Sequence, residues 1–143
     1  MLIHNKATVP ENLISLAKKT PNMPVGIVCA DQASALESAK QACDLNLISP
    51  IFIGNKDGIQ KNSKDLSWDI NNYQIIDQNN DEEAAIIGAQ LAKESKIKVL
   101  IKGNLHTDVL MRIYLKKEFN LIVGKRLSHI WHMTAPSSNK TLF

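Results

Sequence analysis

A chain of 143 residues, with 44% hydrophobic and 22% charged residues, has the length and composition of one soluble globular domain. Its net charge of +3 comes from scattered Lys and Arg, so we expect no nucleic acid or membrane partner, a basic track for polyanions being the alternative. Cys29 and Cys43 have neither metal-ligand nor disulfide-framework spacing, and no apolar run reaches the roughly 18 residues of a membrane span. These features predict a cytoplasmic protein.

The chain begins with an amphipathic helix and a buried strand. Thr8 is expected to cap the helix, Leu13 and Leu16 lie on its apolar side, and Pro21 follows its end. The apolar run at 25–30 then predicts a strand covered on both faces, as in a parallel sheet.

A second helix and strand follow. Asp31 is expected to cap the helix, and the run at 50–54 predicts the strand. The segment 55–72 is polar and poorly patterned, and predicts only a short helix near 58–64 with Trp68 packed against the body.

The rest of the chain repeats this alternation. A less hydrophobic strand near a sheet edge is predicted at 73–77, and Asn80 is expected to cap the helix after it. A strand at 97–101, a helix at 107–119 and a fifth strand at 128–133 complete the pattern. Alternating strands and helices predict a single α/β domain, a three-layer αβα sandwich with a mainly parallel sheet.

Ligands of open parallel sheets bind outside the carboxyl ends of the strands, and one predicted end is rich in polar and small residues. There Gly103 allows the backbone to turn and to approach a ligand closely, and Thr107 would cap the next helix. Lys102 and Arg112 would add positive charge to the electropositive helix end. This pattern predicts a site for an anion such as phosphate, although an ordinary strand-to-helix loop would contain the same residues.

Other kinds of site find less support. The chain has no G-x-G-x-x-G motif, and the residues around Gly124 lack the spacing of a P-loop, which argues against dinucleotide-binding enzymes and NTPases. His129 and His132 would point to opposite faces of a regular strand, so we predict no metal site. No nucleophile, base and acid can be grouped by spacing.

Four stretches resemble one enzyme family, the phosphate acetyl/butyryltransferases. The stretches 100–112 (LIKGNLHTDVLMR) and 125–130 (KRLSHI) carry its more specific motifs, Lys-Gly-x-x-His-Thr and Arg-x-Ser-His. The βαβ pattern of 25–54 and the helix start at 81–85 are similar to the same family. The resemblance covers nearly the whole chain.

The resemblance implies the first domain of the isocitrate/isopropylmalate dehydrogenase-like fold and acyl transfer between an acyl phosphate and coenzyme A. The coenzyme A thiol would attack the acyl carbonyl and phosphate would leave, with coenzyme A as a substrate rather than a permanent cofactor. The reaction needs a base for the thiol and donors for the developing oxyanion. The substrate- and phosphate-binding residues would be Lys102, Gly103, His106, Thr107, Arg112, Arg126 and Ser128. For His106, a local hydrogen bond at the helix start is the alternative to an acid or base.

The family has a second half, which supplies a cleft and the principal Ser, Arg and Asp of the active site. That half is absent here, so we expect this chain alone to show little activity and to need a complementary C-terminal half or a homo-oligomer. A noncatalytic anion- or nucleotide-binding domain and a decayed fragment of such an enzyme remain open alternatives.

Overall fold

The chain folds around a four-stranded parallel sheet. The computed structural model describes residues 9–124, 127–128, 130, 133–134 and 141–142. The strands are β1 (Met23–Val28), β2 (Ile48–Gly54), β3 (Gln74–Asp77) and β4 (Val99–Lys102), in the order β3-β2-β1-β4. All three strand pairs are parallel. The edge position predicted for the third strand is confirmed, because β3 pairs only with β2.

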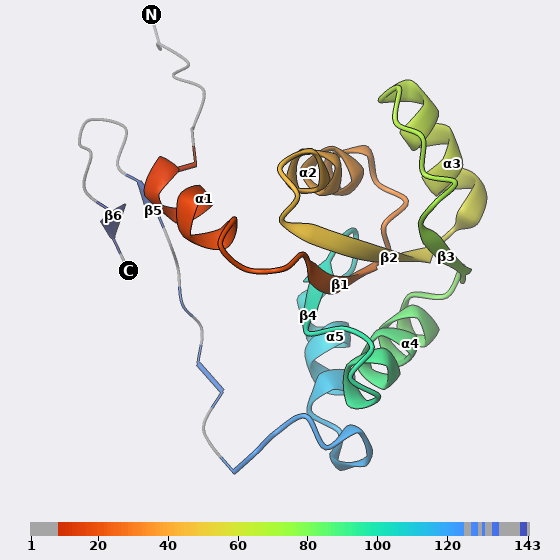
Figure 1. The fold of residues 1–143 in the computed structure, drawn as a ribbon. Helices are drawn as coiled ribbons and strands as arrows, with labels where there is room; N and C mark the ends of the chain where they lie inside the picture. Colours follow the sequence, from red (N-terminus) through yellow and green to blue (C-terminus); the bar gives the residue numbers. More distant parts are fainter. Residues whose placement is uncertain (1–8, 125–126, 129, 131–132, 135–140, 143) are drawn as a thin grey trace, which may run out of the picture.

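Helices cover both faces of this sheet (Figure 1). One face carries α2 (Ala33–Asp44) and α3 (Lys56–Asp65); the other carries α4 (Asp81–Lys93), α5 (Thr107–Tyr114) and a 3₁₀ turn at Lys117–Phe119. The buried apolar residues form two clusters, one in each helical layer. The predicted αβα sandwich is therefore confirmed. A continuous apolar run in the sequence corresponds to a strand whose side chains are buried in both hydrophobic clusters, one on each face of the sheet.

A glycine in α4 brings that helix close to the sheet. A Cβ at Gly88 would lie 2.8 Å from side-chain carbons of both Val28 and Leu100, so a larger residue would push the helix outward. This contact identifies the face of β4 on which Leu100 lies as the α4 face.

An aromatic cluster closes the opposite layer. The ring of the fully buried Phe52 meets Trp68 edge-on, with centroids 5.7 Å apart, and Tyr73 at 6.0 Å. The prediction that Trp68 packs against the body is confirmed, and so is a helix in the polar segment before it.

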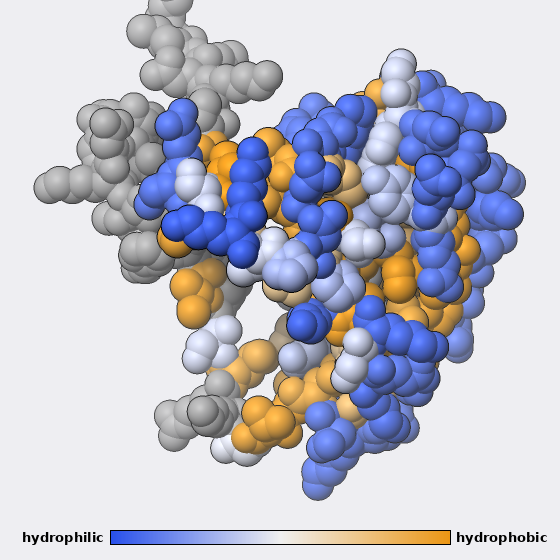
Figure 2. Space-filling model, viewed as in Figure 1, coloured by the Kyte–Doolittle hydropathy of each residue, from blue (hydrophilic) through white to orange (hydrophobic). Residues whose placement is uncertain are grey.

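The predicted fifth strand of the parallel sheet is wrong. Ser128 and Ile130 lie outside any strand, and β5 (Met133–Thr134) pairs antiparallel with β6 (Thr141–Leu142) in a separate two-stranded sheet. Figure 2 shows hydrophobic side chains on the surface of the segment after α5, where Val123 is 80% and Ile130 75% exposed. An apolar run favours burial but does not specify the strand or helix that covers it, and among the described residues β4 has β1 as its neighbour and forms an edge of the sheet.

The predicted apolar side of the first helix is also left uncovered. The helix α1 (Glu11–Ala17) lies to one side of the sheet and buries none of its residues, and Leu16 is 58% exposed. Its expected cap, Thr8, lies outside the described residues.

The predicted caps of α4 and α2 have opposite outcomes. The Asn80 side chain accepts a hydrogen bond from the Glu83 amide at 3.0 Å and caps α4, as expected. Asp31 does not cap α2, because the N-cap is Gln32, and it makes no side-chain cap. The carbonyl of Asp31 instead accepts a hydrogen bond from the Asn62 side chain at 2.7 Å, which ties this loop to α3.

Within the described part of the chain, every helix is too short or too polar to cross a membrane.

Candidate functional site

The strand order creates a crevice between the ends of β1 and β4. From β1 the chain moves to β2 and β3, and then returns to β4 on the other side of β1. The loops after β1 and β4 therefore lead to opposite faces of the sheet. Ligands of open α/β sheets bind at such a switch point. The loop after β4 is the one that the sequence analysis singled out.

Gly103 holds this loop against the end of β1. Its amide donates to the Val28 carbonyl at 2.8 Å, and the Asn104 amide donates to the Cys29 carbonyl at 3.0 Å. A Cβ at Gly103 would overlap the carbonyl oxygen of Cys29 and lie 2.8 Å from that of Val28. Gly103 was predicted to let the backbone approach a ligand; the group that it approaches in the structure is the backbone of Val28 and Cys29 at the end of β1.

The ammonium of Lys102 folds back onto its own loop. Lys102 lies two residues after Leu100, and side chains two apart on a strand share a face, so it starts on the α4 face of the sheet. Its Nζ donates to the Leu105 carbonyl at 2.6 Å and reaches the Gly103 carbonyl at 3.4 Å. Positive charge is thus placed directly beside the turn.

The predicted cap of α5 by Thr107 is wrong. Thr107 is the first helical residue, and the N-cap is His106, which makes no side-chain cap. Both residues are exposed. The Leu110 amide bonds to the His106 carbonyl, whereas the amides before it in the first turn lie ahead of any intrahelical acceptor. Amides of this kind are the groups with which helix N-termini bind anions.

The structure brings together only part of the predicted set. Lys102, Gly103, His106 and Thr107 share one loop. Arg112 lies in the last turn of α5, about 7.5 Å along the axis from Thr107 and on another face. Ser128 is exposed and outside any helix or strand, and Arg126 lies outside the described residues, as do both histidines of the excluded metal site.

A groove adjoins Gly103 on the opposite face of the sheet. It has a volume of 340 Å³, and its walls come from α2, the sheet and the loop after β1. The polar residues Gln32, Ser34 and Ser38 line it together with Lys102 and Gly103. The sequence analysis missed the first three. Their signal was present as polar residues in the loop after a buried strand and on the helix that follows, but only the strand order shows that they lie beside β4.

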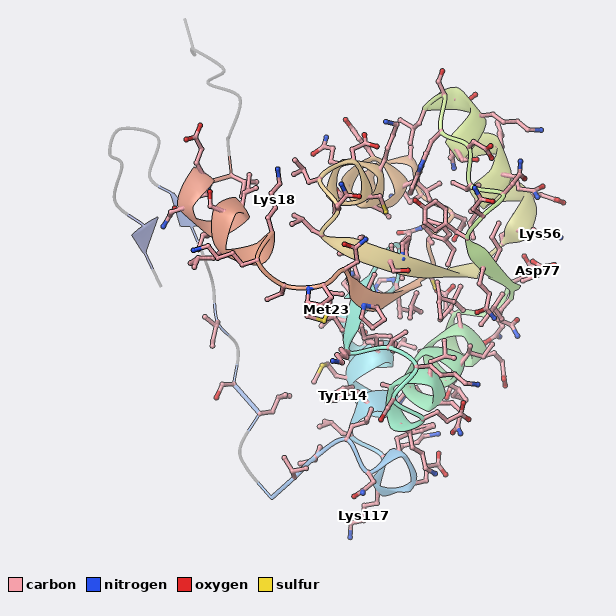
Figure 3. The ribbon with its side chains drawn as sticks, in the orientation of Figure 1. Lys18, Met23, Lys56, Asp77, Tyr114 and Lys117 are labelled. Atoms are coloured by element: carbon pink, nitrogen blue, oxygen red, sulfur yellow. The ribbon has the colours of Figure 1, made fainter. Side chains whose placement is uncertain are left out.

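Negative charge gathers at the neighbouring strand ends. Cys29 is buried, and its thiol donates to the Asp81 carboxylate at 3.6 Å. Burial, followed by the charges of Asp81 and Asp31, raises the pKa of this thiol to about 12, which Lys102 partly opposes. At the ends of β2 and β3, Asp77 accepts from the Lys56 amide at 3.0 Å, and the two residues lie together in Figure 3. An anion is therefore better placed at the end of β4 than at these carboxylates.

Most of this chain is similar in sequence to known proteins. A phosphate butyryltransferase of Clostridium beijerinckii is 28% identical over 133 residues, or 93% of this chain and 44% of the relative. A phosphate acetyltransferase of Rickettsia prowazekii is 33% identical over 129 residues, or 90% of this chain and 37% of the relative. The chain resembles the N-terminal part of the phosphate acetyl/butyryltransferases. It spans less than half the length of these relatives. No protein-family model matches it.

Solved phosphotransacetylases share the fold of the chain. One from Streptococcus pyogenes superposes with a TM-score of 0.62 and 15% identity, over 76% of this chain and 42% of that protein. One from Staphylococcus aureus gives a TM-score of 0.55 and 18% identity, over 71% and 40%. At these identities the superpositions show a common fold, which agrees with the family indicated by sequence.

Proposed function

We propose that this chain supplies one half of a phosphate acyltransferase site, in which an acyl group passes between an acyl phosphate and coenzyme A. Two things support the proposal: the resemblance to phosphate acetyl/butyryltransferases over about nine-tenths of the chain, and the geometry of the loop after β4. The single observation that carries it is the turn at Gly103, which is held against β1 and presents the start of α5 at the switch point.

The chemistry of this loop suits the phosphate group. Free amides at the start of α5 would bind phosphate oxygens, and Lys102 supplies positive charge nearby. His106 is exposed at the same position, within reach of a bound anion. The relatives are more than twice as long as the region they share with this chain. We therefore place the base for the thiol and the principal catalytic groups outside this half.

The partners follow from this assignment. Acyl phosphate, inorganic phosphate and coenzyme A would be the small-molecule partners, with coenzyme A bound as a substrate. A complementary polypeptide or a further copy of the chain would complete the site. A cytoplasmic location suits Cys29 and Cys43, both of which are free thiols.

Titration with inorganic phosphate, followed by amide NMR, tests the anion site. We expect weak binding, of about millimolar Kd, because water reaches the open loop. Shifts should appear at residues 103–112, and Thr107→Val at the start of α5 should weaken binding, whereas Lys61→Ala on α3 should leave it unchanged. Shifts confined to residues 55–72 would mean that the anion binds elsewhere.

An assay of acyl transfer from acetyl phosphate to coenzyme A tests the catalytic part. The purified chain alone should give little or no acetyl-coenzyme A. Robust turnover that Arg112→Ala abolishes would show instead that the 143 residues contain a complete active site.

A further inference from the structure

Lys102 lies at the candidate site, but its ammonium is engaged by the protein itself. The 2.6 Å distance from Nζ to the Leu105 carbonyl oxygen is that of a short, charge-assisted hydrogen bond. The Gly103 carbonyl lies on the same side of the ammonium at 3.4 Å. One cation thus serves two carbonyl groups of the turn that follows it.

These two carbonyls belong to a turn whose amides are hydrogen-bonded and whose Leu105 side chain is buried. The Gly103 and Asn104 amides are bonded to the end of β1, and the side chain of Leu105 is buried in the core below the sheet. The Leu105 amide closes the turn on the Gly103 carbonyl at 3.0 Å. The Leu105 carbonyl is the remaining polar group of that residue, and Lys102 is its hydrogen-bond donor.

We propose that Lys102 is a positioning residue that shapes the anion site through this turn rather than by binding the anion. The proposal rests on the proposed function of the loop. By holding the Leu105 carbonyl, the ammonium fixes the direction in which the chain enters α5, and hence the direction of the amides at the start of that helix. It also offsets the negative ends of two carbonyl dipoles that would otherwise repel an approaching phosphate.

Lys102 also lines the groove beside Ser34 and Ser38. Its ammonium is bonded to the Leu105 carbonyl at 2.6 Å, so a lysine that served as a direct ligand in the groove would have to leave this partner.

Amide hydrogen exchange without any added anion separates positioning from direct binding. In Lys102→Met, the Asn104 and Leu105 amides should exchange about tenfold faster than in the wild type, because the turn loses a charge-assisted hydrogen bond. Amides in the middle of α4 should keep their rates, and Lys102→Arg should restore the slow exchange. Lys98→Met, which removes a lysine just before β4, is the matched control and should change neither amide. If the Met variant does not fold, Lys102→Gln, which lacks the charge of the ammonium, replaces it and should also speed the exchange of both amides.

Phosphate titration of the same variants completes the test. Binding should weaken at least about fivefold in Lys102→Met and recover in Lys102→Arg. Weaker binding with unchanged exchange would make Lys102 a direct ligand and overturn the proposal, as would faster exchange with unchanged binding, or no change in either. If the wild-type protein binds no phosphate, the proposed function fails, whereas unchanged exchange alone contradicts the role assigned to Lys102.

Discussion

At the scale of single residues, the space around the backbone determines which side chains the site accepts. Gly103 has no room for a Cβ, because the carbonyl oxygens of Val28 and Cys29 lie too close to that position. Gly124, by contrast, has open space around it and a φ of +70°. The two glycines therefore serve different purposes, one for close approach and one for backbone conformation.

Replacing each glycine by alanine should distinguish these purposes. Gly103→Ala should lower the free energy of unfolding by about 1–3 kcal/mol and weaken phosphate binding, because the loop must move away from β1. Gly124→Ala should cost about 1 kcal/mol for its left-handed backbone and leave phosphate binding intact. Urea denaturation and phosphate titration measure both effects. Equal phosphate affinities in the two variants would show that the Gly103 contact does not shape the site.

The raised pKa of the buried Cys29 thiol predicts how the free energy of unfolding changes at alkaline pH. Its pKa of about 12 in the folded protein lies above the ordinary value of 9.0, so between these pH values the unfolded chain loses this proton while the folded chain keeps it. The free energy of unfolding should therefore fall as the pH rises through this window, and the stabilisation is complete below pH 9. Between pH 8 and 10.5 the wild type should lose about 2 kcal/mol more than Cys29→Ser.

Urea denaturation of both proteins at the two pH values checks this difference. Cys43 and Tyr73, whose pKa values are also raised by burial, are present in both proteins, so their effects cancel in the comparison. Parallel losses in wild type and variant would contradict the environment assigned to Cys29.

At the scale of elements, the two helices that begin with a candidate cap behave differently. Asn80 accepts a hydrogen bond from the first turn of α4, whereas Thr107 at the start of α5 makes no side-chain cap. Local sequence marks both positions equally well, because Asn and Thr are both favoured N-caps. The path of the chain into each helix decides which residue stands at the cap.

This difference predicts unequal effects of alanine substitution. Asn80→Ala should reduce the free energy of unfolding by about 1 kcal/mol, whereas Thr107→Ala should change it by less than about 0.5 kcal/mol. Asn72→Ala, at an exposed position outside the helices, is the control for loss of an asparagine and should be nearly neutral. Thermal or urea unfolding gives these values, and a cost for Thr107→Ala as large as that for Asn80→Ala would place the cap of α5 at Thr107 after all.

At the scale of the whole molecule, burial is concentrated in the middle of the sheet. β1 pairs with strands on both sides and contributes to both cores, whereas α1 buries none of its residues. An isolated helix of seven residues has little stability of its own in water. The free energy of local opening should therefore be much higher for β1 than for α1.

Native-state hydrogen exchange should show this gradient. Amides of β1 and β2 should exchange most slowly, through global unfolding, whereas those of α1 should exchange within about tenfold of an unstructured peptide. Strong protection of α1 would mean that this helix docks on a surface in solution, and a second copy of the chain would be the first partner to test by measuring the oligomeric state.

Particular segments show which strands and site residues the sequence predicts correctly. The apolar runs at 25–30 and 50–54 predict buried parallel strands, which the structure confirms, and Gly103 with its polar neighbours predicts the loop at the switch point. The run at 128–133 carries a similar apolar signal, but its described residues 128, 130 and 133 lie outside the parallel sheet. The groove residues Ser34 and Ser38 were missed because their importance depends on which strand lies beside β1.

The sequence by itself therefore determined the class of fold, the order of strands and helices along the chain, and the loop that carries the candidate site. These depend on local properties, namely the period of apolar residues and the conformational freedom of glycine. Tertiary structure alone decided the strand order β3-β2-β1-β4, the exposure of α1, the helix caps and the direction of the Lys102 side chain. Each of these is settled by contacts between segments far apart in the chain or by the path of the backbone through a turn, and a local pattern specifies neither.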